Sequence, residues 1–308
     1  MLEALHGIKR HPQATDARLR RRAVAYRHFT PGLFVTHCFA WRDRGRFSCM
    51  LKKARLMKRT LLILATAVAL LASGPLWMLS SDDIRMGQSW SGTDRSSAGL
   101  APRPSSEPRA VVQVYDARAF SWRGIFAVHL WVATKPAGAD SYTVHQVTGW
   151  NRPPLTSRTD LPDRRWVGAT PRLLHDLRGA QAALAIEQIE AALPHYPYGA
   201  YRVWPGPNSN TFVAWLIRQV PALDVELPPT AVGKDYLGGT LFAPAPSATG
   251  YQFSLFGALG VLAAWDEGIE INLFGLVWGI DPGDLAIKWP GLGRIGLLAR
   301  DTNPDAND

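Results

Sequence analysis

The residues best placed for chemistry lie in the stretch Gly206–Pro221, where a Gly-Pro pair and four capping residues precede an almost wholly apolar run. The capping residues are Asn208, Ser209, Asn210 and Thr211. This order predicts a short helix whose first turn is buried in a domain. Such a helix N-terminus carries free backbone N–H groups and the positive end of the dipole, so it can bind an anion or an oxyanion.

Thiol and metal chemistry are excluded for the folded part of the sequence. Both cysteines, Cys38 and Cys49, lie in a basic N-terminal segment, so the remaining residues have neither a disulfide nor a nucleophilic thiol. The eight histidines occur singly, and no His-Glu-x-x-His pattern is present. We therefore expect no metal site and no cofactor.

The formal charge of +9 comes from the N-terminal segment alone. Residues 1–59 contain 15 Lys and Arg against three acidic residues, whereas residues 60–308 contain 19 against 22. The globular part is therefore mildly acidic, and its charge indicates no nucleic-acid partner. With 308 residues, 47% of them hydrophobic, the chain can bury a core without a disulfide or a metal.

Residues 1–56 form a basic N-terminal extension with few periodic apolar positions. Met50 and Met57 each stand shortly before the apolar run, and a short positive region lies between each methionine and that run. This order is typical of a true start. We therefore expect that residues 1–49, and by the same argument 1–56, come from a start placed too far upstream. A disordered cytosolic basic tail is the alternative.

Residues 57–79 are predicted to be a membrane segment. The run Thr60–Leu79 has no charged residue and would be roughly 30 Å long as a helix, about one bilayer thickness. Lys and Arg precede it and two Asp follow it, so the positive-inside rule keeps the N-terminus in the cytosol and exports the rest. Cleavage after Gly74 would satisfy the small-residue rule, but Pro75 would follow the cut and apolar residues continue beyond it. A retained single-pass anchor is therefore favoured over a cleaved signal.

An exported α+β domain is expected over residues 110–300, between a flexible Ser/Pro/Gly-rich tether at 80–109 and a disordered tail at 301–308. Its expected architecture is an antiparallel sheet with a few helices packed on it and a β-rich C-terminal region. His129 and His145 then lie on the two arms of one hairpin. The expected elements are strands at 110–115, 124–133 and 141–150, and helices across 171–193 and from about residue 209.

Three segments resemble a proteobacterial family, the domain of unknown function numbered 3750. They are GIFAVHLW at 124–131, GPNSNTFV at 206–213 and PPTAVGKDY at 228–236. The resemblance extends over roughly residues 98–300. Together with the charge asymmetry, it implies an anchor at residues 60–79 in the inner membrane and a C-terminal domain in the periplasm.

The order of residues is also similar to that of the circularly permuted papain-like group, which includes NlpC-type peptidases and lecithin:retinol acyltransferase relatives. There, a histidine on an early strand and a polar residue on the next precede a cysteine that opens a helix. The resemblance implies a permuted papain-like fold with Ser209 as nucleophile, His129 as base and His145 as the residue that orients the base. Serine replaces cysteine here, and without a thiolate population it depends more on activation by its neighbours.

Each of these residues also has a purely structural interpretation. Ser209 can serve as a helix cap, worth about 1 kcal/mol. His129 can be a hydrogen-bonded core residue, and His145 can face solvent. The tyrosine cluster that contains Tyr201 can be packing rather than pocket lining.

Two function classes therefore stay open. The favoured class is a non-catalytic membrane-anchored domain that binds an envelope peptide or lipid. The alternative is a hydrolase or acyltransferase that acts on amide or ester bonds in the cell envelope. The residues expected to contact the ligand are Asn208, Asn210, Trp131 and Tyr201.

Overall fold

The structure is a computed structural model that describes residues 35–84, 86–87 and 89–297. The predicted tail at 301–308 and residues 1–34 of the predicted extension lie outside the described residues. The chain divides into two compact units, residues 1–62 and residues 63–308. What is described of the first unit is helical and belongs to α1 (Val35–Met78).

Helix α1 confirms that the N-terminal segment is apolar and long enough to cross a membrane. The part from Met50 to Met78 contains an 18-residue window with a mean hydropathy of 2.0, and it is the one such helix among the described residues. The helix is longer than the predicted segment at 57–79, because it continues N-terminally through the basic residues. Basic side chains do not interrupt a helix, since Lys and Arg are good helix formers.

The last turns of α1 pack against the folded domain within the second unit. Ser73 Oγ accepts a hydrogen bond from Trp289 Nε1 at 3.0 Å. Gly74 lies so close to the backbone of Pro290 that an added Cβ would stand 1.9 Å from its carbonyl oxygen. Met78 is buried, and its sulfur accepts a hydrogen bond from the Arg118 guanidinium. Residues 73–78 are therefore part of the fold.

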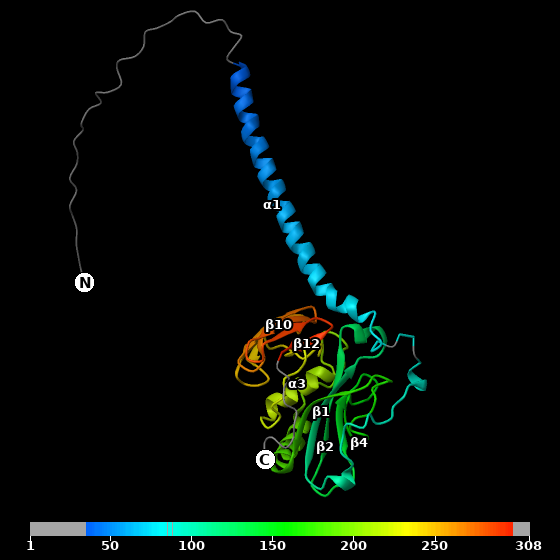
Figure 1. Cartoon of the computed structure of the whole chain (residues 1–308). Helices are drawn as coiled ribbons and strands as arrows, with labels where there is room; N and C mark the ends of the chain where they lie inside the picture. The colour runs from blue at the N-terminus through cyan, green and yellow to red at the C-terminus, as the bar shows by residue number, and fades with distance from the viewer. Residues whose placement is uncertain (1–34, 85, 88, 298–308) are drawn as a thin grey trace, which may run out of the picture. The chain divides into compact units, whose positions relative to one another are not determined.

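The first sheet has five antiparallel strands in the order β4-β3-β2-β1-β5 (Figure 1). Both faces of its central strands are apolar, and each face packs into its own core cluster. Helices α2 (Gly179–Ala192) and α3 (Ser209–Gln219) cover one face. The strands are β1 (Val111–Arg118), β2 (Val128–Lys135), β3 (Thr143–Val147), β4 (Leu155–Thr159) and β5 (Arg172–Arg178).

The other face of this sheet is covered by the segment predicted as a flexible tether. Asp163 holds that segment, because its carboxylate accepts hydrogen bonds from Ser97 Oγ at 2.7 Å and from the Leu100 backbone at 2.6 Å. Glu107 is buried and pairs with Arg109 and Arg178. The tether therefore docks along the domain over these residues, since its polar groups find partners there.

The helical prediction for 171–193 is wrong in its first part. Residues 172–178 form β5, which pairs with β1 along the edge of the sheet. The Arg172 guanidinium binds both carboxylate oxygens of Asp116 across this pair, at 2.8 and 2.5 Å. Leucine spacing suits either element when a glycine interrupts it, and here Gly179, with a φ of +71°, starts the helix.

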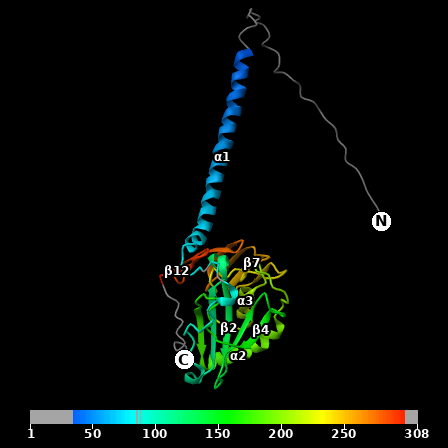
Figure 2. The ribbon, with the colours of Figure 1, turned by 90° about the vertical axis from the view of Figure 1, so that its right-hand side faces the viewer.

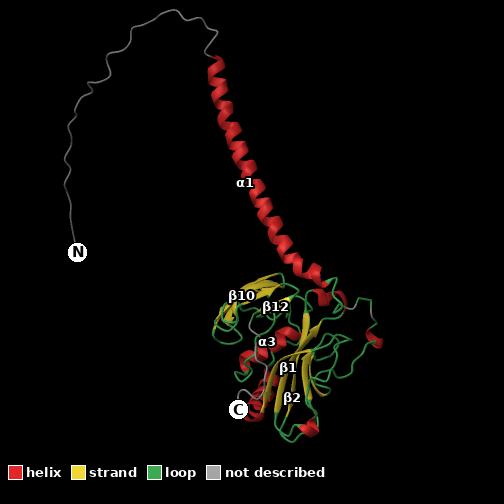
Figure 3. Cartoon of the chain, in the orientation of Figure 1, coloured by secondary structure: helices red, strands yellow, loops and turns green. Residues whose placement is uncertain are grey.

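The second sheet is a seven-stranded antiparallel meander in which every strand pairs with its sequence neighbour. Helix α3 lies between the two sheets, as Figures 2 and 3 show. The α+β class with antiparallel sheets and few helices is thus confirmed. The strands are β6 (Phe242–Pro244), β7 (Gly250–Leu255), β8 (Leu259–Ala264), β9 (Gly268–Leu273), β10 (Leu276–Asp281), β11 (Ala286–Trp289) and β12 (Gly293–Gly296). Short 3-10 helices are η1 (Trp90–Gly92), η2 (Pro104–Ser106), η3 (Ser121–Ile125) and η4 (Leu193–His195).

Candidate functional site

A cavity of about 550 Å³ lies where β2 begins, between the N-terminus of α3 and the turn that joins β9 to β10. Its wall is mostly apolar and aromatic, whereas its polar groups come mainly from Arg123, His129 and the residues at the start of α3. Size and lining are typical of a site that buries an apolar ligand. The aromatic wall consists of Phe120, Trp122, Phe126, Trp150, Trp166, Tyr201, Trp204 and Phe274.

Asn208 caps helix α3 and leaves Ser209 free of that role. The Asn208 Oδ1 accepts hydrogen bonds from the backbone N–H groups of Asn210 and Thr211, at 2.9 and 3.1 Å. The Thr211 hydroxyl in turn accepts from the Asn208 backbone at 3.1 Å, which completes a capping box. A cap of this kind stabilises a helix by about 1 kcal/mol. Ser209 is therefore the first helical residue, and it lines the cavity.

The side chains of Asn208 and Asn210 fasten α3 to its surroundings. Asn208 Nδ2 donates to the carbonyl oxygens of Val203 and Val232, both at 3.0 Å. Asn210 Nδ2 donates to the carbonyl oxygens of Val128 and Val232, at 2.9 and 2.8 Å. Both asparagines line the cavity, but their amide groups are occupied in holding β2, α3 and the 228–236 loop together.

His129 lines the same cavity as a neutral, fixed imidazole. Its Nε2 donates to Gln146 Oε1 at 3.2 Å, and its ring stacks on Trp166 with centroids 3.5 Å apart. Burial lowers the pKa of His129 to about 3, although the Gln146 hydrogen bond opposes the shift. The imidazole is therefore uncharged at neutral pH, and it is a weak base.

His145 lies on the opposite face of the sheet from His129. It pairs with Val132, so it shares the face of Thr134, whose hydroxyl lies 3.0 Å from His145 Nε2. Its Nδ1 lies 2.8 Å from the Ser157 hydroxyl, and burial lowers its pKa to about 4. The expectation that His145 orients His129 is contradicted by this register, because side chains alternate between faces along a strand. Gln146, one residue further on, holds His129 instead.

The structure separates the two aromatic residues expected to contact a ligand. Tyr201 lines the cavity, and its ring lies against Gly149, where an added Cβ would come within 2.9 Å of it. Trp131 is buried, stacks 5.6 Å from Tyr115 and donates its Nε1 hydrogen to the Pro162 carbonyl oxygen at 2.7 Å. It supports the wall from behind, because it stacks on both His129 and Trp166.

Ser209 and His129 share the cavity without a hydrogen bond between them. Among the hydrogen bonds of the described residues, Ser209 Oγ has one partner, Asn210 Oδ1 at 3.4 Å. The nucleophile and base of a serine hydrolase are usually within hydrogen-bond reach, although the distance can be longer without substrate. Their catalytic roles stay a prediction.

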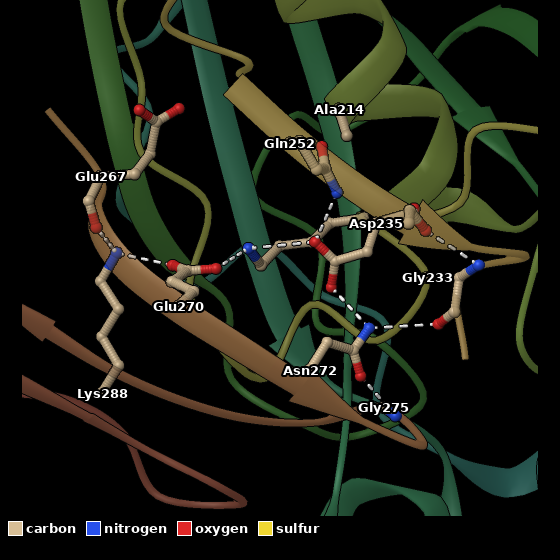
Figure 4. Close-up of polar contacts among 12 residues, drawn as sticks. Ala214, Gly233, Asp235, Gln252, Glu267, Glu270, Asn272, Gly275 and Lys288 are labelled. Carbon is tan, nitrogen blue, oxygen red and sulfur yellow. Dashed lines mark hydrogen bonds and ion pairs between the residues drawn. The ribbon is translucent and has the colours of Figure 1, made fainter. Parts of the chain in front are cut away.

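A group of buried ionic residues lies beneath the second sheet (Figure 4). Lys288 Nζ donates to Glu270 Oε1 and to the Glu267 carbonyl oxygen, both at 2.6 Å, and it also pairs with Glu226. Glu270 binds Lys234 through its other oxygen. The two lysines therefore share one carboxylate. Each of these four side chains has a partner of opposite charge, so none is an unpaired buried charge.

Asp235 connects these ion pairs to the amide side chains of the sheet. Its carboxylate accepts from Gln252 Nε2 and Asn272 Nδ2, both at 2.8 Å. Burial raises the pKa of Asp235, although the ammonium group of Lys234 opposes this. Burial alone would also raise the pKa of Glu270, but Lys234 and Lys288 outweigh it and hold that pKa below its ordinary value.

The ionic group also positions the cavity floor. Lys234 and Asp235 end the loop whose carbonyl oxygens receive the side chains of α3. Val232 accepts from both asparagines, and the Gly233 carbonyl oxygen accepts from the Thr211 hydroxyl at 2.7 Å. A network that fixes the loop therefore fixes the N-terminus of α3 as well.

Residues 109–236 match a family model described as protein of unknown function (DUF3750). This is shorter than the 98–300 that the resemblance suggested. The match includes the first sheet, α2, α3 and the Lys234-Asp235 pair, and it ends before the second sheet. No curated protein matches the chain, and no solved structure does.

Sequence reasoning missed Gln146, Trp166 and the whole ionic group. A signal for the ionic group was present, because Glu270 and Asn272 alternate with apolar residues along the predicted strand. For Gln146 the signal is weaker, since only the pairing register shows that it shares a face with His129. In the part of the chain that the structure describes, no three His, Cys, Asp or Glu are grouped to hold a metal ion.

Proposed function

We propose that the chain is a single-pass membrane protein of the bacterial envelope, exported C-terminally of α1, whose cavity binds the hydrocarbon part of a lipid. The observation that carries this proposal is the cavity itself, with about 550 Å³ of space and a wall of aromatic and aliphatic side chains. A peptide would require more hydrogen-bonding partners than such a wall offers, because its backbone groups lose those of water. A hydrocarbon chain requires none.

The surroundings of α1 support a lipid as the ligand. An apolar groove of about 380 Å³ lies between the end of α1 from Val68, with Leu79 just after it, and the residues just before β2. Phe126 and Leu276 line both the groove and the cavity. An acyl chain that follows α1 out of the bilayer would therefore reach the cavity along an apolar surface, without exposure to water. Gly74, Pro75 and Met78 are buried against the domain, which supports a retained anchor, since a cut after Gly74 would separate Gly74 from the other two.

The polar end of the cavity suits the oxygen atoms of an ester or amide. The Ser209 hydroxyl can donate a hydrogen bond there, and the positive end of the α3 dipole favours a partial negative charge. In this proposal Ser209 binds the lipid's polar group and the aromatic wall binds its chain.

One observation favours a second candidate, an acyl hydrolase or acyltransferase: Ser209 and His129 line the same cavity at a helix N-terminus. Two observations weigh against it. His129 is held by Gln146, and its pKa of about 3 makes it a poor proton acceptor at neutral pH. The relation to the permuted papain-like group stays a prediction, because no solved structure matches the chain.

Photocrosslinking tests the lipid proposal. The full-length protein is placed in phosphatidylethanolamine nanodiscs that contain a trace of the same lipid with a diazirine in its acyl chain. We expect crosslinks to the cavity segments 119–127 and 203–204. Val203→Trp should fill the cavity and lower this crosslinking several-fold, whereas Leu184→Trp, at an exposed position on α2, should leave it unchanged. Equal crosslinking in both variants would contradict the proposal.

A fluorophosphonate probe on the same preparation separates binder from hydrolase. We expect no labelling of the wild type, because Ser209 lacks an activating base. Strong labelling that is lost in both Ser209→Ala and His129→Ala would instead establish the hydrolase alternative.

A further inference from the structure

The second sheet has its polar face inside and its apolar face outside. The inward row across its strands consists of Gln252, Leu262, Glu270, Gly279, Lys288 and Arg294. The residues between them point outward. The long outward row consists of Tyr251, Ala263, Ile269, Ile280, Ile287 and Ile295. An antiparallel sheet with one solvent-exposed face normally has its apolar side chains inward and its polar side chains outward.

The outward side chains form a continuous apolar face, which we name the outer face. A second row beside the first consists of Phe253, Val261, Ile271 and Trp278, and a third of Leu255, Leu259, Leu273 and Leu276. No charged residue occurs in any of the three rows. The five isoleucines of the outer face expose 46% to 55% of their surface.

Such a face is not stable in contact with water. Contiguous apolar patches on monomeric soluble proteins rarely exceed a few hundred Å², and larger ones mark a surface that something covers. A strand that faces water would have its glutamate outward and its isoleucines inward. The reverse arrangement here indicates that the outer face meets an apolar neighbour.

The neighbour that the structure points to is the lipid bilayer. The end of α1, the helix that can cross a membrane, packs on the turn between β11 and β12 through Ser73, Gly74 and Pro75. Both views place β12 beside the last turns of α1 (Figures 1 and 2). A sheet fixed to the end of a membrane span must lie close to the membrane surface.

We propose that the outer face of the second sheet lies on the membrane into which α1 inserts, with its side chains among the lipid acyl chains. This rests on the membrane anchoring in the proposed function, but it does not depend on what the cavity binds. Trp77, Tyr251 and Trp265 are exposed around this region, and such aromatic side chains prefer the membrane–water interface. The strands between the edges satisfy their backbone groups in the ladder, so only side chains need to meet lipid.

The position of the cavity agrees with this placement. Phe274 and Gly275, which form the turn between β9 and β10, and Leu276, which begins β10, line the cavity at one end of the outer face. A sheet that lies on the bilayer would hold the mouth of the cavity at the level of the lipids.

Depth-dependent quenching tests the proposal on the full chain. Cys38→Ser and Cys49→Ser remove both native cysteines, and a fluorescent NBD label is then placed through Ile271→Cys or, as an independent outer-face variant, Ile287→Cys. Leu64→Cys reports the membrane span, and Glu187→Cys, on the exposed side of α2, reports water. Each protein is reconstituted into phosphatidylcholine vesicles that contain a doxyl-labelled phospholipid, with iodide as the quencher in water.

We expect the labels at positions 271 and 287 to be quenched by the doxyl lipid nearly as strongly as the label at 64, and several-fold more than at 187. Iodide quenching at 271 and 287 equal to that at 187 would overturn the proposal. Protection from both quenchers would overturn it too, because it would show a second copy or another protein on this face. If position 64 is quenched by lipid and 271 is not, the anchor is right and the sheet placement is wrong. If the label at position 64 is not quenched by the lipid, both the membrane anchor and the sheet placement are wrong.

Discussion

The two sheets of this protein bury opposite kinds of side chain. The first sheet packs apolar residues into a core cluster on each face, with a few buried polar side chains such as Gln113, Asp116 and Lys135 among them. The second sheet turns ion pairs and amides inward, around Lys234, Glu270 and Lys288, and turns isoleucines outward. Alternation along a strand therefore defines two faces, but which one is inside depends on what each face meets.

The two sheets therefore also differ in the interactions that stabilise them. The two core clusters of the first sheet are stabilised mainly by the burial of apolar surface, at roughly 25 cal/mol per Å². Buried charges in the second sheet stabilise only as complete pairs, because the desolvation of each ion must be offset by its partner. The family match covers the first sheet and the residues Lys234 and Asp235, but not their partners on the second sheet. The second sheet is thus joined to the matched segment through ionic contacts.

The largest expected effect tests the interior of the second sheet. Glu270→Gln removes the carboxylate that Lys234 and Lys288 share, and it leaves two ammonium groups with less than their full complement of negative charge. We expect the free energy of unfolding to fall by about 3–5 kcal/mol. Chemical denaturation of the full chain in detergent micelles measures this.

The matched control for that change is Glu187→Gln on the exposed surface of α2, which should alter the free energy of unfolding by no more than about 0.5 kcal/mol. A similar small effect for both variants would show that the interior of the second sheet is hydrated, and the contrast between the sheets would then disappear.

A smaller effect comes from the two buried histidines of the first sheet. Their pKa values in the folded state, about 3 for His129 and about 4 for His145, lie below the unfolded value of roughly 6.5. The unfolded chain therefore binds more protons than the native chain below pH 6.5, so stability is complete above that pH and is lost as the pH falls toward 4 and 3. We expect each histidine to lower the free energy of unfolding by about 2–3 kcal/mol between pH 7 and pH 4.5.

The buried carboxylates of the ionic group change the stability in a different pH range from the histidines, or with the opposite sign. The lowered pKa of Glu270 places its loss of stability below its ordinary titration range, and the raised pKa of Asp235 works against the histidines. The comparison of wild type with His129→Gln at the two pH values isolates the contribution of His129. An unchanged pH dependence in His129→Gln would show that His129 titrates as in the unfolded chain.

Much of the fold follows from local sequence signals. The Asn208–Thr211 capping cluster predicted the start of α3, and the uncharged run from Thr60 predicted the apolar part of α1. The site was predicted less completely. Ser209, Asn208, Asn210, His129 and Tyr201 all line one cavity, although they come from distant parts of the chain.

What the sequence did not predict depends on long-range pairing. His145 and Gln146 are neighbours, and only the register of β3 against β2 decides which of them faces His129. Residues 172–178 became a strand because the edge of β1 was free to pair with them, which no local propensity reports. The ionic group joins a loop to β9 and β11, so it requires the full topology.

The smallest expected change is that of Val261→Ala, which is compared with its neighbour Leu262 to test the orientation of the second sheet at two adjacent residues of β8. Val261 is 46% exposed on the outer face, whereas Leu262 is 2% exposed on the inner one. In detergent micelles, which cover the outer face before and after the change, Val261→Ala should alter the free energy of unfolding by no more than about 0.5 kcal/mol. Leu262→Ala should lower it by about 2–5 kcal/mol, because it leaves a cavity in the interior. A strand shifted by one residue would exchange the two results, since the shift moves every side chain to the other face. The ratio of the two effects therefore reports the register directly, and with it which row of β8 faces the ionic group and which faces outward.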